Sequence, residues 1–228
     1  MFNFDADISI DFDNIEQNQN GKNKIPDDKN KLCCNCSKVI AKTFVRKPIN
    51  IYKKAFSELE LSKILTNNFE DGYSYHCLSN GDIDSLSYLK HIIKQQSLKY
   101  VLFSTWCMAN DDVFQLKEWI DSKKIIRLDA YCGEIFPGSY KKEYNNLCKI
   151  VKECNGRVAI CKNHSKIYAG YGEKFYFAIE SSANINTNPR IENTTVHIGK
   201  DIYDFYKSFY DGIISFDKVF DGWEAFNG

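Results

Sequence analysis

Five polar side chains in the last third of the chain have the types and the spacing of a phosphate site. His164 and Lys166 lie two residues apart and would project from the same face of a strand, and the same spacing separates Ser182 from Asn184. Lysine supplies a fixed positive charge, while serine and asparagine supply neutral donors for phosphoryl oxygens. A neutral imidazole can attack phosphorus near pH 7, and a carboxylate such as Glu192 can hydrogen-bond the far ring nitrogen. The segment therefore indicates phosphoryl chemistry centred on His164.

Each of these residues also has a purely structural interpretation. A single histidine beside a strand is more often a hydrogen-bonded surface or core residue than a catalyst. The sequence SSAN at 181–184 is typical of a loop or a helix start, and Arg190 with Glu192 could form an exposed ion pair of little energetic value. The order of all the members after a regular β/α pattern favours the functional interpretation.

Other chemistries have weaker support. The chain has no G-x-x-x-x-G-K-[ST] and no G-x-G-x-x-G, so it lacks these nucleotide-binding loops. Cys33, Cys34 and Cys36 leave a zinc site as an alternative, but no second cysteine pair stands at ligand spacing. Cys107, in STWC, has no histidine close to it in the sequence. We expect it, like most of the nine cysteines, to be a buried thiol.

Regular alternation of strand and helix patterns begins near residue 73. Strands are expected at 73–79, 100–107, 127–134 and 157–161, and helices at 82–96, 110–123 and 139–155. A hairpin of strands at 164–169 and 175–182 follows, and then a last helix at 201–213. The pattern predicts an α/β fold with a mixed, largely parallel sheet flanked by helices, preceded by a flexible N-terminal arm.

The N-terminal residues differ in composition from the rest. We predict a flexible acidic tail at 1–31, an arm at 32–72 that packs on the main domain, and the α/β domain at 73–228. The net charge is zero, yet residues 1–30 hold seven acidic residues against three lysines, so the remainder is mildly basic. This balance argues against a general nucleic-acid binder and is compatible with a phosphate-bearing substrate.

Membrane and secretion signals are missing from the sequence. No run of apolar residues is long enough for a membrane span, so we expect none. The first residues form neither a basic nor an apolar leader region, and we expect a cytoplasmic protein.

The order of the polar residues resembles a known family. His164-x-Lys166, then SSAN at 181–184, then Glu192-Asn193 resembles the HxK…GSxN…E arrangement of the phospholipase D superfamily, in particular its single-motif, nuclease-type members. The stretch ESSANINTNPRIEN is similar to uncharacterised phospholipase-D-like proteins of bacteria and their phages. The resemblance covers roughly two thirds of the chain, from about residue 73 onward.

The resemblance implies a phosphodiesterase, most often a nuclease, that needs no metal or other cofactor and works through a phosphohistidine. His164 would be the nucleophile or the acid/base. Lys166 and Asn184 would hold the phosphate, Ser182 would assist, and Glu192 would orient the imidazole.

Such a mechanism uses two histidines, and only one HxK is present. His76, His91 and His197 are not followed by lysine two residues later. The resemblance therefore implies a homodimer in which each chain gives one histidine, with nucleic acid or another phosphodiester as the substrate.

Two positions depart from the family pattern. Tyr171 stands where the family usually has an aspartate, five residues after the lysine, and Ser181 replaces the glycine of GSxN. The alternative function is therefore a catalytically degenerate module of the same fold that binds nucleic acid or a protein partner. The sequence leaves open whether the phosphodiester is DNA, RNA or another ester.

Overall fold

The computed structural model describes residues 46–227 apart from 47, 56–57, 66–67, 81–82, 84 and 187–189, and it gives no side-chain description for 50–59 and 64. The predicted acidic tail and the cysteines at 33, 34 and 36 lie outside the described residues, and so do the interpretations placed on them.

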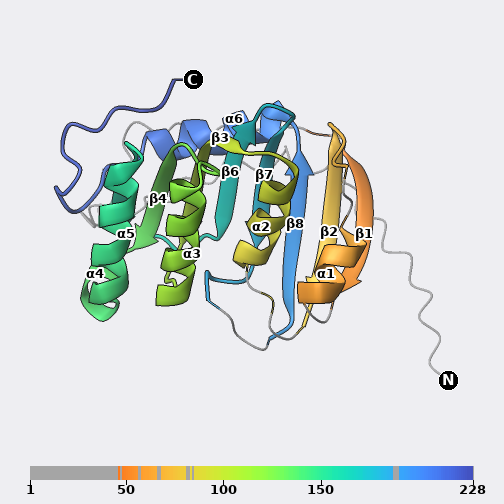
Figure 1. The fold of residues 1–228 in the computed structure, drawn as a ribbon, viewed down its shortest axis with the longest axis horizontal. Helices are drawn as coiled ribbons and strands as arrows, with labels where there is room; N and C mark the ends of the chain where they lie inside the picture. The colour runs from red at the N-terminus through yellow and green to blue at the C-terminus, as the bar shows by residue number, and fades with distance from the viewer. Residues whose placement is uncertain are drawn as a thin grey trace, which may run out of the picture. The chain divides into compact units, whose positions relative to one another are not determined.

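The described residues form an eight-stranded sheet with the order β1-β2-β8-β7-β6-β3-β4-β5 (Figure 1). The strands are β1 Ile49–Ala55, β2 Tyr73–Ser79, β3 Leu98–Thr105, β4 Leu128–Gly133, β5 Val158–Cys161, β6 Ile167–Gly172, β7 Tyr176–Ser181 and β8 Glu192–Ile198. Within this described sheet, β1/β2, β3/β4 and β4/β5 are parallel pairs, and the other four neighbouring pairs are antiparallel. The sheet is mixed, as predicted, but it is not largely parallel, because β6, β7 and β8 form antiparallel pairs in its centre.

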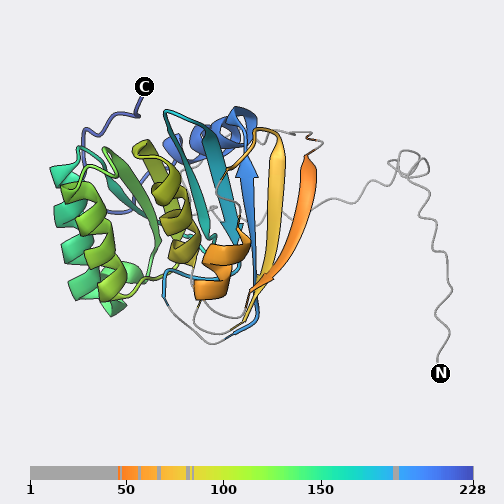
Figure 2. The ribbon, with the colours of Figure 1, turned by 45° about the vertical axis from the view of Figure 1, so that its right-hand side comes forward.

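Helices flank the sheet on both faces (Figures 1 and 2). The elements are α1 Glu58–Ile64, α2 Ser85–Gln95, α3 Asn110–Asp121, α4 Phe136–Ser139, α5 Lys141–Glu153 and α6 Lys200–Asp211. Helices α1 to α5 cover one face, and α6 covers β6 and β7 on the other. No helix that the structure describes is long and apolar enough to cross a membrane.

The amphipathic pattern of the helices accounts for their packing. Helix α2 buries Leu86, Leu89, Ile92 and Ile93 against the sheet, the apolar stripe that its sequence predicts. The central strand β3 is buried along its whole length except at Lys99, because helices cover it on both faces.

Glycine is required where α5 leads into β5. A Cβ at Gly156 would lie 1.7 Å from the carbonyl oxygen of Leu128, so only glycine fits between the end of α5 and the start of β4. The Gly156 amide also donates to the carbonyl oxygen of Val151 at 3.0 Å, which closes the end of α5.

The structure differs from the expected elements in two ways that matter for the site. Strand β6 begins at Ile167, so His164 and Lys166 belong to the segment that precedes the strand. Strand β8, which the sequence pattern did not predict, begins at Glu192 and pairs with both β7 and β2.

Candidate functional site

Four strand ends meet at one edge of the sheet. Strands β3 and β7 end there, at Thr105 and Ser181, while β6 and β8 begin there, at Ile167 and Glu192. The antiparallel pairing of β6 with β3 and β7, and of β7 with β8, brings these ends together. Segments that are far apart in the sequence therefore share this edge.

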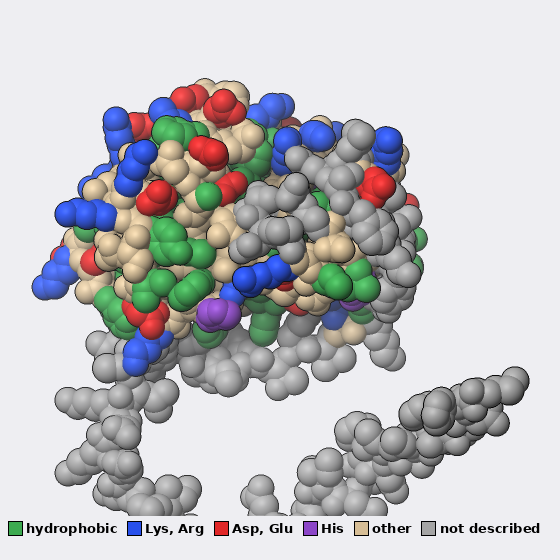
Figure 3. All heavy atoms as spheres, turned by 90° about the horizontal axis from the view of Figure 1, so that it is seen from below, with side chains coloured by type: hydrophobic (Ala, Val, Ile, Leu, Met, Phe, Trp, Pro, Cys, Tyr) green, Lys and Arg blue, Asp and Glu red, His purple; other side chains and the backbone are tan. Residues whose placement is uncertain are grey.

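A pocket of about 210 Å³ lies at this edge, and it contains every predicted site residue. Its lining includes His164, Lys166, Ser182, Asn184 and Glu192. It also includes Trp106, Ile83, Ala183, Asn186 and Arg190. Figure 3 views the molecule from the end where these strands meet and shows histidine and basic side chains at the surface. The structure thus brings together side chains from the segment before β6, the segment after β7 and the start of β8.

His164 and Lys166 contact each other at the pocket. The imidazole is exposed, whereas only 7% of Lys166 is. The Lys166 ammonium lies 3.0 Å from Nδ1 of His164 and donates to the His164 carbonyl oxygen at 2.6 Å. The same ammonium lies 3.4 Å from Nε2, so both ring nitrogens face it, and the nitrogen without a proton is the acceptor.

Burial sets the acidity of this lysine. Desolvation lowers the pKa of Lys166 below its ordinary value, because it disfavours the charged form. The nearby Cys107 and Glu192 oppose this shift. The ammonium is thus partly desolvated and close to a carboxylate, an arrangement that an anionic ligand would stabilise further.

Asn163 fixes the segment that carries these two residues. Its Nδ2 donates to the carbonyl oxygen of Thr105, at the end of β3, at 3.1 Å and to that of Tyr131, within β4, at 3.0 Å. Its Oδ1 accepts the amide of Ser165 at 3.1 Å. One side chain thereby ties the backbone beside His164 to two central strands.

A buried hydroxyl network supports the same segment from below. The Ser165 hydroxyl is 2.7 Å from that of Ser104 on β3 and 2.7 Å from that of Tyr210 on α6. Tyr210 also donates to Ser104 at 2.8 Å, and Arg157 donates to the Tyr210 carbonyl oxygen at 3.0 Å. The C-terminal turn of α6 is therefore coupled to the residue between His164 and Lys166.

Ser182 and Glu192 form the opposite wall. The Ser182 hydroxyl donates to the Glu192 carboxylate and accepts the Asn193 amide at 3.1 Å. The predicted hydrogen bond between Glu192 and the ring of His164 is thus not made among the described residues. The Glu192 carboxylate bonds Ser182 instead, and the ring nitrogens of His164 face Lys166.

Asn184 brings an unpartnered amide oxygen to the pocket. Its main chain is held because its carbonyl oxygen accepts the Ser85 hydroxyl at 3.3 Å. Its Oδ1 is buried and has no hydrogen-bond partner among the described residues. A buried acceptor without a partner costs free energy, so a ligand that supplies a donor would be favoured here.

Among the pocket residues, sequence reasoning missed Trp106 and misjudged Arg190. Trp106 lines the pocket, although only its neighbour Cys107 was considered from the sequence. Arg190, considered only as a surface ion-pair partner, is exposed and adds a second permanent positive charge to the lining. The one available signal for Trp106 was its place directly after a strongly apolar strand.

Cys107 and Tyr171 lie in the core. Cys107 is buried, and desolvation raises the pKa of its thiol, as expected for an unreactive cysteine. Tyr171 lies near the far end of β6, with its ring centroid 5.0 Å from that of Tyr176 and 5.5 Å from that of Tyr203 on α6. The position where the family carries an aspartate is therefore part of an aromatic cluster under α6.

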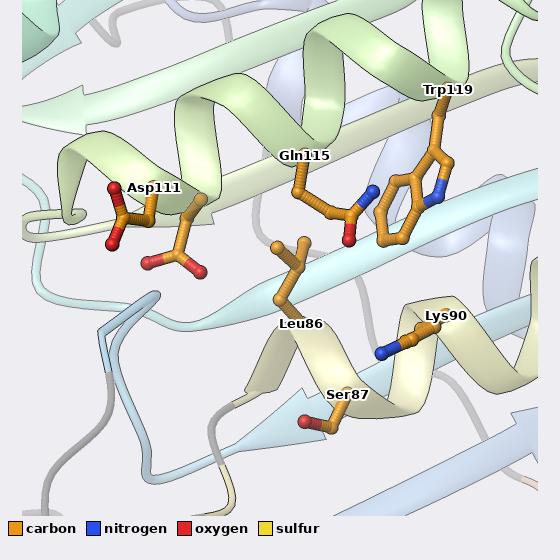
Figure 4. A pocket seen from close by; sticks show the side chains of 7 residues that line it. Leu86, Ser87, Lys90, Asp111, Gln115 and Trp119 are labelled. Atoms are coloured by element: carbon orange, nitrogen blue, oxygen red, sulfur yellow. The ribbon is translucent and has the colours of Figure 1, made fainter.

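A second pocket of similar volume lies between α2 and α3 (Figure 4). It is lined by Leu86, Ser87, Lys90, Asp111, Asp112, Gln115 and Trp119, and it contains none of the predicted site residues. Its two aspartates are in the first turn of α3, where carboxylates stabilise a helix N-terminus. In the part of the chain that the structure describes, no group of three His, Cys, Asp or Glu side chains could hold a metal ion.

Comparison with known proteins finds partial likenesses in fold. No family model matches the sequence, and no curated protein matches it. Polyphosphate kinase from Porphyromonas gingivalis matches with a TM-score of 0.45 and 13% identity over 60% of this chain and 25% of that chain. Phosphatidylserine synthase from Haemophilus influenzae Rd KW20 matches with a TM-score of 0.44 and 9% identity over 61% of this chain and 38% of that chain. The chain thus spans well under half the length of either protein.

Proposed function

We propose that the protein is a metal-independent phosphodiesterase of the phospholipase D type, and more narrowly a nuclease that works through a phosphohistidine at a site shared across a homodimer. The observation that carries the proposal is the convergence of His164, Lys166, Ser182, Asn184 and Glu192 on one pocket. An exposed imidazole beside a buried ammonium is suited to attack on an anionic phosphoryl group.

The internal hydrogen bonds of the pocket give a route for substrate binding. Lys166 now contacts the imidazole of His164, and Ser182 contacts Glu192. A phosphoryl group would accept from both Lys166 and Ser182. Their former partners, His164 and Glu192, would then be able to bond each other, with Nδ1–H of the ring donating to the carboxylate and the lone pair of Nε2 left for attack.

The chemistry proceeds in two displacements. Nε2 of His164 forms a bond to phosphorus as the bond to the leaving oxygen breaks, and the imidazolium of the second chain protonates that oxygen. The resulting imidazole then takes a proton from water, whose oxygen bonds phosphorus and releases His164. Lys166 and Arg190 stabilise the charge on the phosphoryl oxygens in both steps.

The test is hydrolysis in the presence of EDTA. Purified protein is incubated with DNA, RNA and a chromogenic phosphodiester, and we expect turnover that His164→Ala lowers by about a thousandfold or more. Lys149→Ala, which removes an exposed lysine from α5, is the matched control and retains full activity. An alkaline quench during turnover traps the acid-labile phosphohistidine. Full activity in His164→Ala, or no turnover of any ester, contradicts the proposal.

The second candidate is a binding module without catalysis. It is favoured by Tyr171, which is packed among aromatic side chains where the family has an aspartate. In that case the protein binds nucleic acid in a salt-dependent manner, Lys166→Ala weakens the binding, and no ester is cleaved.

A further inference from the structure

Trp106 is an aromatic side chain beside the proposed nucleophile. It directly follows β3 and lines the same pocket as His164 and Lys166. Its ring centroid lies 5.8 Å from that of His164, with 52° between the ring planes. The phosphodiesterase mechanism proposed above assigns no role to this indole.

The indole is held firmly at the end of β3. The carbonyl oxygen of Thr105 accepts from Asn163 at 3.1 Å, and the Thr105 hydroxyl donates to the Cys107 carbonyl oxygen at 2.7 Å, so the backbone is fixed on both sides of Trp106. A Cβ at Gly133 would lie 2.7 Å from Cδ1 of Trp106. Glycine at the end of β4 therefore makes room for the ring, and the ring is positioned before any ligand binds.

A packing role alone does not account for the exposure of Trp106. It packs against the main core and yet remains half-buried, whereas Trp119 on α3 is only 8% exposed. Trp106 lines a pocket whose other side chains are mainly polar and include Lys166 and Arg190. An aromatic surface next to two cations is the combination that binds single-stranded nucleic acid, because bases stack on the ring while the cations hold the backbone.

We propose that Trp106 stacks on an unpaired nucleobase next to the phosphate at His164, and that the substrate class is therefore single-stranded nucleic acid. The inference rests on the proposed function in one respect, which is that the phosphate binds at His164. An unpaired base is required because both faces of a paired base within a duplex are already stacked. Aromatic stacking depends little on base identity, so the preference is for single strands and not for a sequence.

The test compares two ligands with equal numbers of phosphates. A fluorescently labelled single-stranded oligonucleotide and an abasic oligonucleotide of the same length are titrated against the full chain in a His164→Ala background, which prevents cleavage. Trp106→Leu keeps an apolar side chain and removes the aromatic ring. We expect it to weaken binding of the base-containing strand roughly 5- to 150-fold, which corresponds to the loss of one stacked base. The ratio of the two affinities, base-containing over abasic, should fall by the same factor. Trp106→Phe retains a ring and restores part of the preference.

The controls separate this inference from the proposed function. Lys166→Ala weakens both ligands, and Phe114→Ala, which removes an exposed aromatic residue of α3, changes neither. An equal effect of Trp106→Leu on both ligands, or no effect, overturns the stacking role. If the wild type cleaves no ester but shows the Trp106-dependent preference, only the proposed function fails. If it cleaves esters and Trp106→Leu leaves the preference intact, only the stacking role fails.

Discussion

At the scale of single residues, the desolvated ammonium of Lys166 lowers the stability of the fold and favours the binding of a phosphoryl group. Its ammonium is almost fully buried, and desolvation is the main cause of its lowered pKa. A buried charge is unfavourable unless its partners compensate for the lost hydration. Here the partners are the ring and carbonyl oxygen of His164, which are neutral, and Glu192, which is engaged with Ser182. The negative charge of a bound phosphoryl group would compensate the ammonium for its lost hydration, which the folded protein alone does not do.

We therefore predict opposite effects of Lys166→Met on binding and on stability. Removal of the ammonium abolishes detectable phosphate binding, yet the melting temperature stays the same or rises, because the desolvated charge is gone. The lowered pKa means that the folded protein binds fewer protons than the unfolded chain between that pKa and the ordinary lysine value, so wild-type stability rises with pH over this range. The stabilising effect of Lys166→Met should shrink as the pH rises through the same range.

Thermal denaturation and phosphate titration measure the two effects, with Lys149→Met as the matched exposed lysine. If Lys166→Met melts well below Lys149→Met at neutral pH, the contacts of the ammonium with His164 outweigh its desolvation. In that case the prediction that the Lys166 ammonium lowers the stability of the fold while it favours phosphate binding is wrong.

At the scale of elements, the sequence pattern predicted the strands and helices of the β/α run but not β8. Thr194 and Thr195 are buried in β8, so this strand lacks the apolar alternation that marks a strand in sequence. Their hydroxyls are paired across the sheet, Thr194 with Ser181 at 2.8 Å and Thr195 with His76 at 3.1 Å. Those pairings join residues distant in the chain, and local patterns do not contain them.

The same limit applies to the candidate site. The members of the motif could be found because they follow one another in a recognisable order between residues 164 and 192. Trp106 could not, because its place beside His164 depends on the antiparallel pairing of β3 with β6, in which Ser104 is opposite Ile167. Sequence reasoning also placed His164 in a strand. In the structure it lies in the preceding segment, which Asn163 bonds to the backbone of β3 and β4 and which the hydroxyls of Ser104 and Tyr210 contact.

The contact of Ser165 with Tyr210 leads to a prediction about this residue of α6. Tyr210→Phe removes the hydroxyl that bonds Ser165 and Ser104, and it should lower kcat by roughly ten- to a hundredfold with little change in KM, because the imidazole is less well positioned. Loss of these two hydrogen bonds should lower the free energy of unfolding by only about 1–3 kcal/mol. Steady-state kinetics and denaturant unfolding measure both quantities.

Tyr203→Phe is the matched control, since Tyr203 lies on the same helix but packs with the rings of Tyr171 and Tyr176. It should retain full kcat. If Tyr210→Phe loses stability but retains kcat, the hydroxyl network is structural and does not position the nucleophile.

At the scale of the whole molecule, the proposed two-histidine mechanism needs a second chain. All four histidines lie in the described residues, and among them only His164 lines the pocket. His91 is on the buried face of α2. His197 is bonded to Ser74 at 2.6 Å, and the ring of His76 faces the Thr195 hydroxyl, so both serve the pairing of β2 with β8. The proposed mechanism therefore takes its second histidine from another copy of the chain.

Mixed dimers test this arrangement, because activity depends differently on the wild-type fraction for a shared site and for independent sites. Wild-type and His164→Ala subunits are unfolded together and refolded in varied ratios, and the activity per total protein is measured. If each site needs a histidine from both chains, activity falls with the square of the wild-type fraction, to roughly a quarter in an equal mixture, because only wild-type pairs work. Independent sites give a linear fall, to roughly half. Mixing with Lys149→Ala subunits, in which the site is intact, should cause no loss. A linear dependence, or a monomer at catalytic concentrations, would show that the single histidine acts alone and that the shared site does not exist.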